Sequence, residues 1–417
     1  MKPYKLIILM CSFLLLFVSI VRILPTQESV SFAYETDLWD IQSVDTVKYS
    51  RDLAREKADL SLFDAEIEQQ VASIAAVGAS HVAIGTPYDE EFLPFMKRWI
   101  APARKYGLNV WFRGNFSGWE RWFGYQSITS DSHTALLSEF IRANGDLFEN
   151  SDVFDPCTEC ENGGAGDPRR TGDVTGYRAF LIDEHRTATD SFRAIGKNVR
   201  IVHSMNGDVA RLIMDKETTQ ALGGVVTIDH YVKSPQKLAE DVESIASASG
   251  GTVILGEFGA PVPDLHGNLD QDGQEKWINE TLTLLAKSNQ LTGINYWTGY
   301  GGSTRLWEQD GTPRKAVSTV QSYYNPRILM GTVTDEIENP IVGALVTLGI
   351  KEVVTDESGA FVIPYVFENE KLIISAEGYN SIEVEDAPSQ IFPIVLFRQQ
   401  EGLVFKLQKL IHGVINK

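Results

Sequence analysis

The chain is poor in cysteine, histidine and basic residues. Its 417 residues include three cysteines and seven histidines, and 37 Lys and Arg face 56 Asp and Glu, a formal net charge of −19. Nucleic-acid binding requires a basic surface that neutralises phosphates, so this balance excludes that class of partner. So few cysteines exclude a disulfide-rich scaffold and a four-cysteine zinc site, and no histidine pair at metal-ligand spacing lies near them. We expect neither a metal nor a cofactor.

What the sequence does contain is typical of a folded protein. Hydrophobic residues make up 43% of the chain and charged residues 22%, with 8 Trp, 14 Tyr and 20 Phe. No biased tract is long enough to indicate disorder. The length favours one large domain accompanied by something smaller.

The N-terminus has the composition of an export signal. Lys2 and Lys5 precede an apolar run over residues 6–21, and no small-x-small cleavage site follows it cleanly. We therefore expect residues 1–24 to form an uncleaved signal anchor, a transmembrane helix with a cytoplasmic N-terminus, followed by a linker over residues 25–44. This predicts a membrane-anchored protein whose catalytic domain is extracellular. A cleaved signal and a secreted protein remain the alternative.

Residues 45–325 alternate short β-branched runs with amphipathic helical patterns. The predicted strands are 46–50, 81–84, 109–113, 152–155, 200–203, 225–230, 252–257 and 293–297. Eight strand–helix units indicate an α/β fold of the (β/α)8 TIM-barrel type. An open doubly wound sheet would carry a glycine-rich phosphate turn after its first strand, and none is present.

After Pro326 the pattern changes to short alternating strands separated by turn sequences, which predicts a small all-β sandwich over residues 327–397. The segments Gly331-Thr332-Val333-Thr334-Asp335, Pro340-Ile341-Val342-Gly343-Ala344 and Gly359-Ala360-Phe361 resemble the carboxypeptidase regulatory-like (transthyretin-like) family. The resemblance implies a non-catalytic accessory module. Residues 398–417 form a basic amphipathic tail, which either lies on a membrane surface or packs on a domain.

Two carboxylates stand where a barrel places its active site, at the carboxyl ends of strands. Glu159 follows the fourth predicted strand, and Glu257 closes the seventh. Cleavage of a glycosidic bond uses such a pair, one to protonate the leaving oxygen and one to act at the anomeric carbon. Gly256 and Gly259 beside Glu257 indicate close approach of neighbouring backbone.

Four segments resemble the clan A retaining glycoside hydrolases, in particular the family 5 cellulase-like group. They are Thr158-Glu159-Cys160-Glu161-Asn162, Ile228-Asp229-His230-Tyr231, Gly256-Glu257-Phe258-Gly259 and Tyr296-Trp297. The resemblance implies Glu257 as nucleophile and Glu159 as acid/base. It also implies that His230 and Tyr231 border the nucleophile and that Trp297 lies under the bound sugar.

The chain departs from the family pattern beside the acid/base. Thr158 replaces an Asn that binds the sugar 2-hydroxyl, and either Asn115 or Asn206 is a candidate substitute. Glu161 remains a rival for the acid role. Cys157 and Cys160 flank Glu159, either as a loop-stiffening disulfide or as free thiols.

Arg113, at the end of the third predicted strand, is a candidate pocket residue, and we expect it to keep Glu257 ionised together with Tyr231. The sequence thus predicts an exported glycosidase that acts on a β-linked oligo- or polysaccharide by double displacement. The alternative is a degenerate barrel that binds carbohydrate or assembles at a surface without turnover.

Overall fold

The computed structural model describes residues 36–163, 166–385 and 393–399. The predicted signal anchor over residues 1–24 and the tail from residue 400 onward lie outside these residues. Within the part of the chain that is described, no helix has the length and hydrophobicity to cross a membrane.

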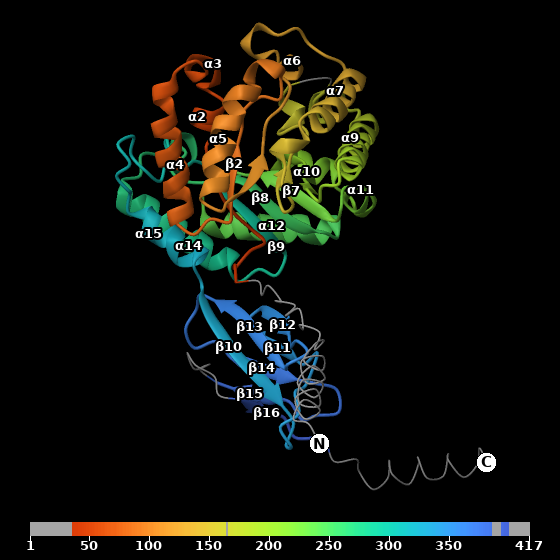
Figure 1. The fold of residues 1–417 in the computed structure, drawn as a ribbon, viewed down its shortest axis with the longest axis vertical. Coiled ribbons are helices and arrows are strands. Elements are labelled where there is room, and N and C mark those ends of the chain that lie inside the picture. Colours follow the sequence, from red (N-terminus) through yellow and green to blue (C-terminus); the bar gives the residue numbers. More distant parts are fainter. Residues whose placement is uncertain (1–35, 164–165, 386–392, 400–417) are drawn as a thin grey trace, which may run out of the picture. The chain divides into compact units, whose positions relative to one another are not determined.

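A curled parallel sheet forms the centre of the first domain (Figure 1). Its order is β5-β4-β3-β2-β1-β9-β8-β7-β6. The strands are β1 Ile41–Asp45, β2 His81–Ile84, β3 Asn109–Phe112, β4 Val153–Phe154, β5 Arg200–Ile201, β6 Ser204–Asn206, β7 Val225–Asp229, β8 Thr252–Phe258 and β9 Leu291–Tyr296. The end strands β5 and β6 are separated along the chain by only Val202 and His203. The chain itself therefore links the two ends of the curled sheet.

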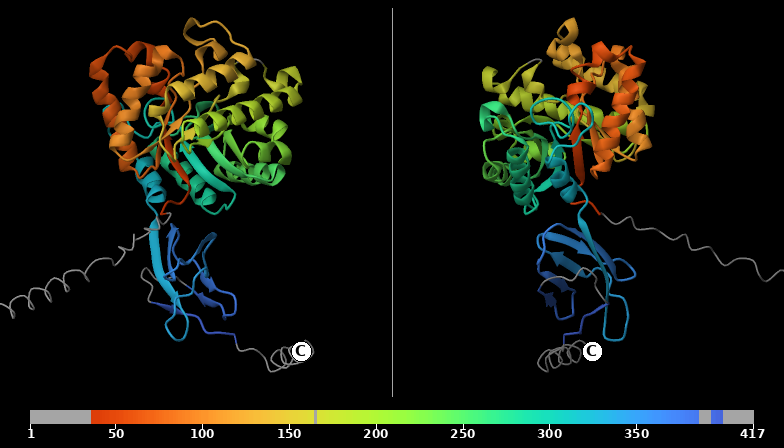
Figure 2. Two further views of the ribbon diagram at one scale, coloured as in Figure 1. Left: turned by 45° about the vertical axis from the view of Figure 1, so that its right-hand side comes forward. Right: turned by 90° about the vertical axis from the view of Figure 1, so that its left-hand side faces the viewer.

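Helices cover the outer face of this sheet (Figure 2). The longer ones are α4 Asp64–Ala76, α5 Leu93–Lys105, α7 Ser130–Ala143, α9 Val174–Ala194, α10 Gly207–Ile213, α11 Lys216–Ala221, α12 Pro235–Ser249, α14 Gln271–Leu285 and α15 Ala316–Tyr324. The short ones are α2 Val47–Ser50, α3 Ala54–Lys57, α6 Ser117–Glu120, α8 Pro168–Thr171 and α13 Pro263–His266. Single 3-10 turns are η1 Ser61–Phe63, η2 Glu90–Phe92, η3 Trp122–Gly124, η4 Gly145–Leu147 and η5 Cys160–Asn162. Beyond the first strand the predicted alternation of strands and helices is confirmed except at one place. The single strand predicted over residues 200–203 is replaced by β5 and β6 with no helix between them, so the described sheet has nine strands rather than eight.

The first predicted strand, residues 46–50, is wrong. The strand ends at Asp45, before which every residue of β1 is buried, and α2 begins at Val47. Asp45 causes the turn because its Oδ1 accepts a hydrogen bond from the Val47 amide at 2.6 Å. The sheet therefore begins upstream of the boundary drawn at residue 45.

Alternation along the strands divides buried side chains between two faces of the sheet. One buried cluster contains Ile41, Ala83, Trp111, Val153, Val202 and Ile254. The neighbouring positions Val44, Val82, Val110, Phe154 and Val253 belong to the larger cluster shared with the helices. The first set therefore fills the inside of the curled sheet. Two or four residues further along, Ile41, Trp111 and Val153 are followed by Asp45, Arg113 and Asp155, and Val225, which packs against the same cluster, is followed by Asp229. Four strands therefore end in charged residues on the inner face.

The C-terminal domain consists of two small sheets around one hydrophobic cluster. The first contains β10 Arg327–Thr334, β13 Ala360–Tyr365 and β16 Ile394–Val395. The second contains β11 Leu345–Leu348, β12 Lys351–Val354, β14 Leu372–Ser375 and β15 Ile382–Val384. Leu329 and Phe361 of the first sheet share a core with Val346 and Ile374 of the second. The predicted all-β module is confirmed, while its likeness to carboxypeptidase regulatory-like domains stays a prediction.

Candidate active site

The guanidinium of Arg113 lies at the carboxyl end of the curled sheet. Arg113 follows β3, and only 3% of its side chain is exposed. Its Nη1 lies 3.2 Å from Asp45 Oδ2, and its Nη2 lies 2.8 Å from Asp229 Oδ2 and 3.1 Å from Glu257 Oε1. Arg113 also donates to the carbonyl of Gly256. One cation therefore binds carboxylates from β1, β7 and β8.

Neighbouring residues fix this cluster further. Asn295 on β9 donates its Nδ2 to Asp45 Oδ2 at 3.0 Å and to the Gly256 carbonyl at 2.8 Å. A Cβ at position 256 would lie 2.4 Å from Asp229 Oδ1, and one at Gly259 would lie 2.4 Å from the carbonyl of Trp297. The close backbone approach predicted from the two glycines is confirmed at Gly259, whereas the close neighbours of Gly256 are side chains.

Glu257 lies between Arg113 and an aromatic hydroxyl. Tyr231 donates its hydroxyl to Glu257 Oε2 at 2.9 Å, as the resemblance implied. Burial nevertheless raises the pKa of Glu257 to about 7, although Arg113 lowers it, and the charges of Glu159 and Asp45 act in the raising direction. The expectation that the two donors hold this pKa down is therefore wrong: both contacts are present, but burial outweighs them.

The same two opposing effects act on the pKa of Asp229. Burial raises the pKa of Asp229 well above its ordinary value, while Arg113 lowers it. Its Oδ1 is buried with no hydrogen-bond partner among the described residues. Three carboxylates around one guanidinium leave excess negative charge in a buried site, which agrees with the raised pKa values of Glu257 and Asp229.

The aromatic residues predicted for the sugar site lie together. The rings of Tyr231 and Trp297 are 5.7 Å apart and meet edge to face at 76°. The Lys48 ammonium lies 5.1 Å from the Trp297 ring centroid, so one side of the indole is occupied. The peptide that follows Trp297 is cis. This pair places an aromatic surface beside Glu257.

His230 is held by a helix. Its Nε2 lies 2.8 Å from Asp241 Oδ2 on α12, and its backbone amide donates to the Glu257 carbonyl at 2.9 Å. Burial lowers the pKa of His230. The side chain is thus oriented by Asp241, and the sugar contact predicted for it stays a prediction.

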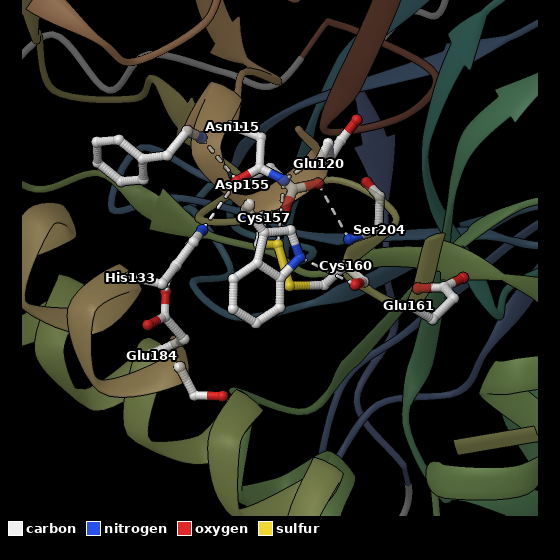
Figure 3. Close-up of a disulfide and its surroundings, with 12 residues drawn as sticks. Asn115, Glu120, His133, Asp155, Cys157, Cys160, Glu161, Glu184 and Ser204 are labelled. Atoms are coloured by element: carbon white, nitrogen blue, oxygen red, sulfur yellow. Dashed lines mark hydrogen bonds and ion pairs between the residues drawn. A yellow bond between two sulfur atoms is a disulfide. The ribbon is translucent and has the colours of Figure 1, made fainter. Parts of the chain in front are cut away.

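Cys157 and Cys160 form a disulfide with Cα atoms 5.1 Å apart, which settles the choice between disulfide and free thiols (Figure 3). Glu159 lies between them with φ 47° and ψ 49°, a left-handed conformation uncommon for a residue with a side chain. Its amide donates to the Ser204 carbonyl at 2.9 Å. The backbone of Glu159 is therefore fixed on both sides.

The two candidate acids have different surroundings. Glu159 is half-buried, and its Oε2 accepts from Asn162 Nδ2 at 3.1 Å. Glu161 is 3% exposed and accepts from the Asn206 amide at 2.7 Å and from its Nδ2 at 2.8 Å. The Tyr177 hydroxyl donates to it at 3.3 Å. Burial raises the pKa of Glu161. Asn206, a candidate for the sugar 2-hydroxyl, is therefore engaged with Glu161.

Thr158 stands where the family pattern has Asn. Its hydroxyl is buried and has no hydrogen-bond partner among the described residues. The sugar contact predicted for Thr158 stays a prediction.

Asn115 is the centre of a second buried network. Its Nδ2 donates to Glu120 Oε1 at 2.9 Å and contacts Cys157 Sγ at 3.4 Å. Its Oδ1 lies 2.8 Å from His133 Nε2, and His133 Nδ1 lies 3.1 Å from Glu184 Oε2. Asn115 is 3% exposed. The structure thus connects this predicted sugar ligand to the disulfide loop and to Glu120, a residue that sequence reasoning missed.

Comparison with known proteins gives similarity at the level of fold. No protein-family model matches the chain, and no curated protein matches its sequence. A GH5_18 variant from Streptomyces cattleya in complex with Manβ1-4GlcNAc has a TM-score of 0.52 and 15% identity, over 71% of this chain and 85% of that one. A GH5_18 variant from Bifidobacterium longum, with the same disaccharide, has a TM-score of 0.51 and 14% identity, over 72% and 84%. The chain shares its fold with these glycoside hydrolases.

Longer proteins are matched less closely. A Bacteroides uniformis β-glucuronidase has a TM-score of 0.49 and 13% identity, over 86% of this chain and 48% of that one. The chain spans 44% and 47% of the length of β-glucuronidases 2 and 3 from the same organism.

The charge imbalance around Arg113 predicts how stability depends on pH. A carboxyl group whose pKa is raised by folding binds its proton more tightly in the folded state, so stability falls as pH rises from its ordinary pKa, 4.5, to the folded value of about 7. Glu257→Gln removes this contribution. We measure the free energy of unfolding in urea for the wild type and for Glu257→Gln. The value for the variant minus that for the wild type should increase from pH 5 to pH 8, by up to roughly 3 kcal/mol. The control Glu139→Gln, exposed on α7, should leave the difference near zero. A gain for Glu257→Gln that is independent of pH would contradict the assignment.

Proposed function

We propose that this chain is a retaining glycoside hydrolase acting on a β-linked glycan, with Glu257 as nucleophile and Glu159 as acid/base. The proposal rests on the position of Glu257 at the end of β8. Arg113 Nη2 lies 3.1 Å from its Oε1, and the Tyr231 hydroxyl lies 2.9 Å from its Oε2, so the orientation of the carboxylate is fixed. Glu159 follows β4 and so lies toward the same carboxyl end of the parallel sheet as Glu257, and its charge acts to raise the pKa of Glu257. The GH5_18 fold agrees with this assignment, and the closed (β/α)8 barrel is part of the proposal.

In the first step, the ionised carboxylate of Glu257 attacks the anomeric carbon and the bond to the leaving oxygen breaks. Glu159 transfers its proton to that oxygen, so the leaving sugar departs neutral. Arg113 and Tyr231 fix the orientation of the attacking carboxylate, which limits the loss of entropy at the transition state. The sugar, which was β-linked in the substrate, is now bound to Glu257 as an α-linked ester.

In the second step, Glu159, now a carboxylate, takes a proton from water as the water attacks the anomeric carbon. The ester bond breaks and Glu257 is released with its charge restored. Ester formation removes one negative charge from the cluster around Arg113, which relieves the excess of carboxylates there. The cluster is therefore best balanced in the covalent intermediate.

Glu159 is assigned as acid/base in preference to Glu161 because of their hydrogen bonds. Glu161 is buried and accepts two hydrogen bonds from Asn206, which fix its carboxylate within the protein. Glu159 is more exposed and accepts from the exposed Asn162 alone among the described residues. An acid that must reach a substrate oxygen needs an accessible carboxyl group.

The substrate class follows from the surroundings of Glu257. Tyr231 and Trp297 provide an aromatic surface of the type that packs against sugar rings, and the GH5_18 structures were solved with saccharides. The proposal includes export, because Lys2 and Lys5 followed by the apolar run over residues 6–21 are typical of an export signal. The catalytic domain would then lie on the extracellular side of the membrane.

Glu257→Gln should abolish hydrolysis. Wild-type protein is incubated with β-glucans, β-mannans, β-xylans and nitrophenyl β-glycosides, and the anomer first released is determined by proton NMR. We expect retention of configuration and a loss of at least about 1,000-fold in kcat for Glu257→Gln, because the bond-forming group is removed. Glu139→Gln should retain wild-type rates. Undiminished hydrolysis by Glu257→Gln would refute the nucleophile, and saccharide binding without any hydrolysis by the wild type would favour the non-catalytic alternative.

Azide distinguishes the two candidate acids. Replacing the acid/base by Ala should slow hydrolysis of a nitrophenyl glycoside roughly 100-fold or more, and azide, which needs no general base, should restore the rate by forming a glycosyl azide. We expect this rescue for Glu159→Ala and no rescue for Glu161→Ala. Rescue confined to Glu161→Ala would transfer the role to Glu161.

A further inference from the structure

A cavity of about 930 Å³ lies beside the disulfide loop, and its lining includes none of the residues to which the proposed reaction assigns a role. Its walls are formed by the connection from β3 to α7 and the connection from β4 to α9. The lining includes Glu120, Asp131, Glu161, Asn162 and Arg170. Its volume lies within the range typical of small-molecule sites.

Glu120 is the best fixed of the carboxyl groups contributed by the first wall. Asn115 donates to its Oε1 at 2.9 Å, and the orientation of Asn115 is itself fixed. The Phe116 amide donates to Asn115 Oδ1 at 2.8 Å, and His133 Nε2 lies 2.8 Å from the same oxygen. Figure 3 shows this chain of side chains next to the disulfide. The support behind Glu120 is therefore buried and built from several elements.

The cavity adjoins the proposed acid/base. Asn162, which lines the cavity, donates its Nδ2 to Glu159 Oε2 at 3.1 Å. Burial raises the pKa of Glu120 to about 7 and raises that of Glu161, and the charge of Glu159 acts in the same direction on both. Both carboxyl groups line the cavity, whereas Glu257, Tyr231 and Trp297 do not. In a double displacement the leaving sugar is the one next to the acid/base. The cavity thus lies on the leaving-group side of the site.

The lining determines which sugar fits. Trp119 also borders the cavity but is 2% exposed, stacked on Phe180 and donating its Nε1 to the Cys160 carbonyl, so its face is not free for a sugar. Recognition must come from polar groups. Carboxylates accept hydrogen bonds from sugar hydroxyls and repel other anions. With Glu120 and Glu161 protonated, the lining has two carboxylates, Asp131 and Asp167, against Arg121 and Arg170, and with them ionised it is negative. In neither state is there an excess of cations to bind a carboxylate, so the cavity suits a neutral sugar rather than a uronic acid.

We propose that this cavity binds the leaving sugar of the substrate as a neutral saccharide and that Glu120 determines its specificity by accepting hydrogen bonds from its hydroxyl groups. Asn115 acts through Glu120 and is a positioning residue. The inference rests on the proposed glycosidase function and adds the residue and the ligand class on the leaving-group side.

The test compares two substrates that share the sugar at Glu257 and differ in the leaving group. One is the neutral β-linked disaccharide cleaved best by the wild type, and the other is the nitrophenyl glycoside of its non-reducing sugar. We expect Glu120→Gln to lower kcat/KM for the disaccharide at least about tenfold more than for the nitrophenyl glycoside, because only the first has hydroxyl groups in the cavity. Glu120→Asp, which withdraws the carboxylate, should show the same preference to a lesser degree, and Glu139→Gln should show none.

Equal losses on both substrates would overturn the inference, because they would show that Glu120 acts on Glu159 or on folding. Undiminished disaccharide cleavage would overturn it too. Should Glu120→Gln fail to fold, Glu120→Asp decides by the same ratio. Failure of the proposed function has a different signature: the wild type then hydrolyses neither substrate. In that case binding of cellobiose, mannobiose and xylobiose is measured by calorimetry. The inference is overturned if the wild type binds none of them, or if Glu120→Gln binds the best of them as tightly as the wild type does.

Discussion

The pairing of one buried guanidinium with three carboxylates is the constraint on which the rest of this site depends. A charged group that leaves water without partners is costly, and breaking a buried pair costs several kcal/mol, so Arg113, Asp45 and Asp229 each require the others. The cluster joins the ends of β1, β3, β7 and β8, and it accounts for Gly256, where any side chain would collide with Asp229. It also leaves Glu257 incompletely neutralised, which is why burial raises its pKa in spite of a cation at 3.1 Å.

The end of β3 organises both halves of the proposed chemistry. Arg113 points to Glu257, and Asn115, two residues later, contacts the disulfide and Glu120. The residue between them is Gly114, where a Cβ would lie 2.3 Å from the Thr86 carbonyl. Three consecutive residues therefore couple the nucleophile to the loop that carries Glu159. The backbone of that loop is further limited by the disulfide and by the amide of Glu159 bound to Ser204. The site is thus organised around the end of β3, where Arg113 holds Glu257 and Asn115 holds Glu120.

The sequence predicted the elements whose signals are local. Runs such as residues 81–84 and 252–257 are apolar and β-branched, and the structure has strands at both places. The first strand was misplaced because Asp45, which ends β1, was not recognised as a turn-forming residue, and Thr46, Val47 and Tyr49 are residue types that favour strands. Glu257 and Tyr231 could be paired through the family pattern, but the net effect on the pKa of Glu257 depends on burial, which no motif encodes.

Asp45, Asp229 and Asn295 were missed as a set. Each is a polar residue at an inward position near the end of an apolar strand, and alternation reveals this signal once the strand register is known. Glu120 carried no local signal, because its role comes from Asn115 and from a cavity between two loops.

The covalent intermediate is the most direct test of the central claim, that the carboxylate held by Arg113 forms the bond to the sugar. The wild-type protein is incubated with a 2-deoxy-2-fluoro-β-glycosyl fluoride of the sugar that it cleaves best, whose second step is slow enough for the ester to accumulate. Intact mass is then measured, and the labelled peptide is sequenced by mass spectrometry. The account predicts one sugar per chain, attached to Glu257. A label on Glu159, Glu161 or Glu120, or no label on an enzyme that releases fluoride and hydrolyses the parent substrate, would contradict it.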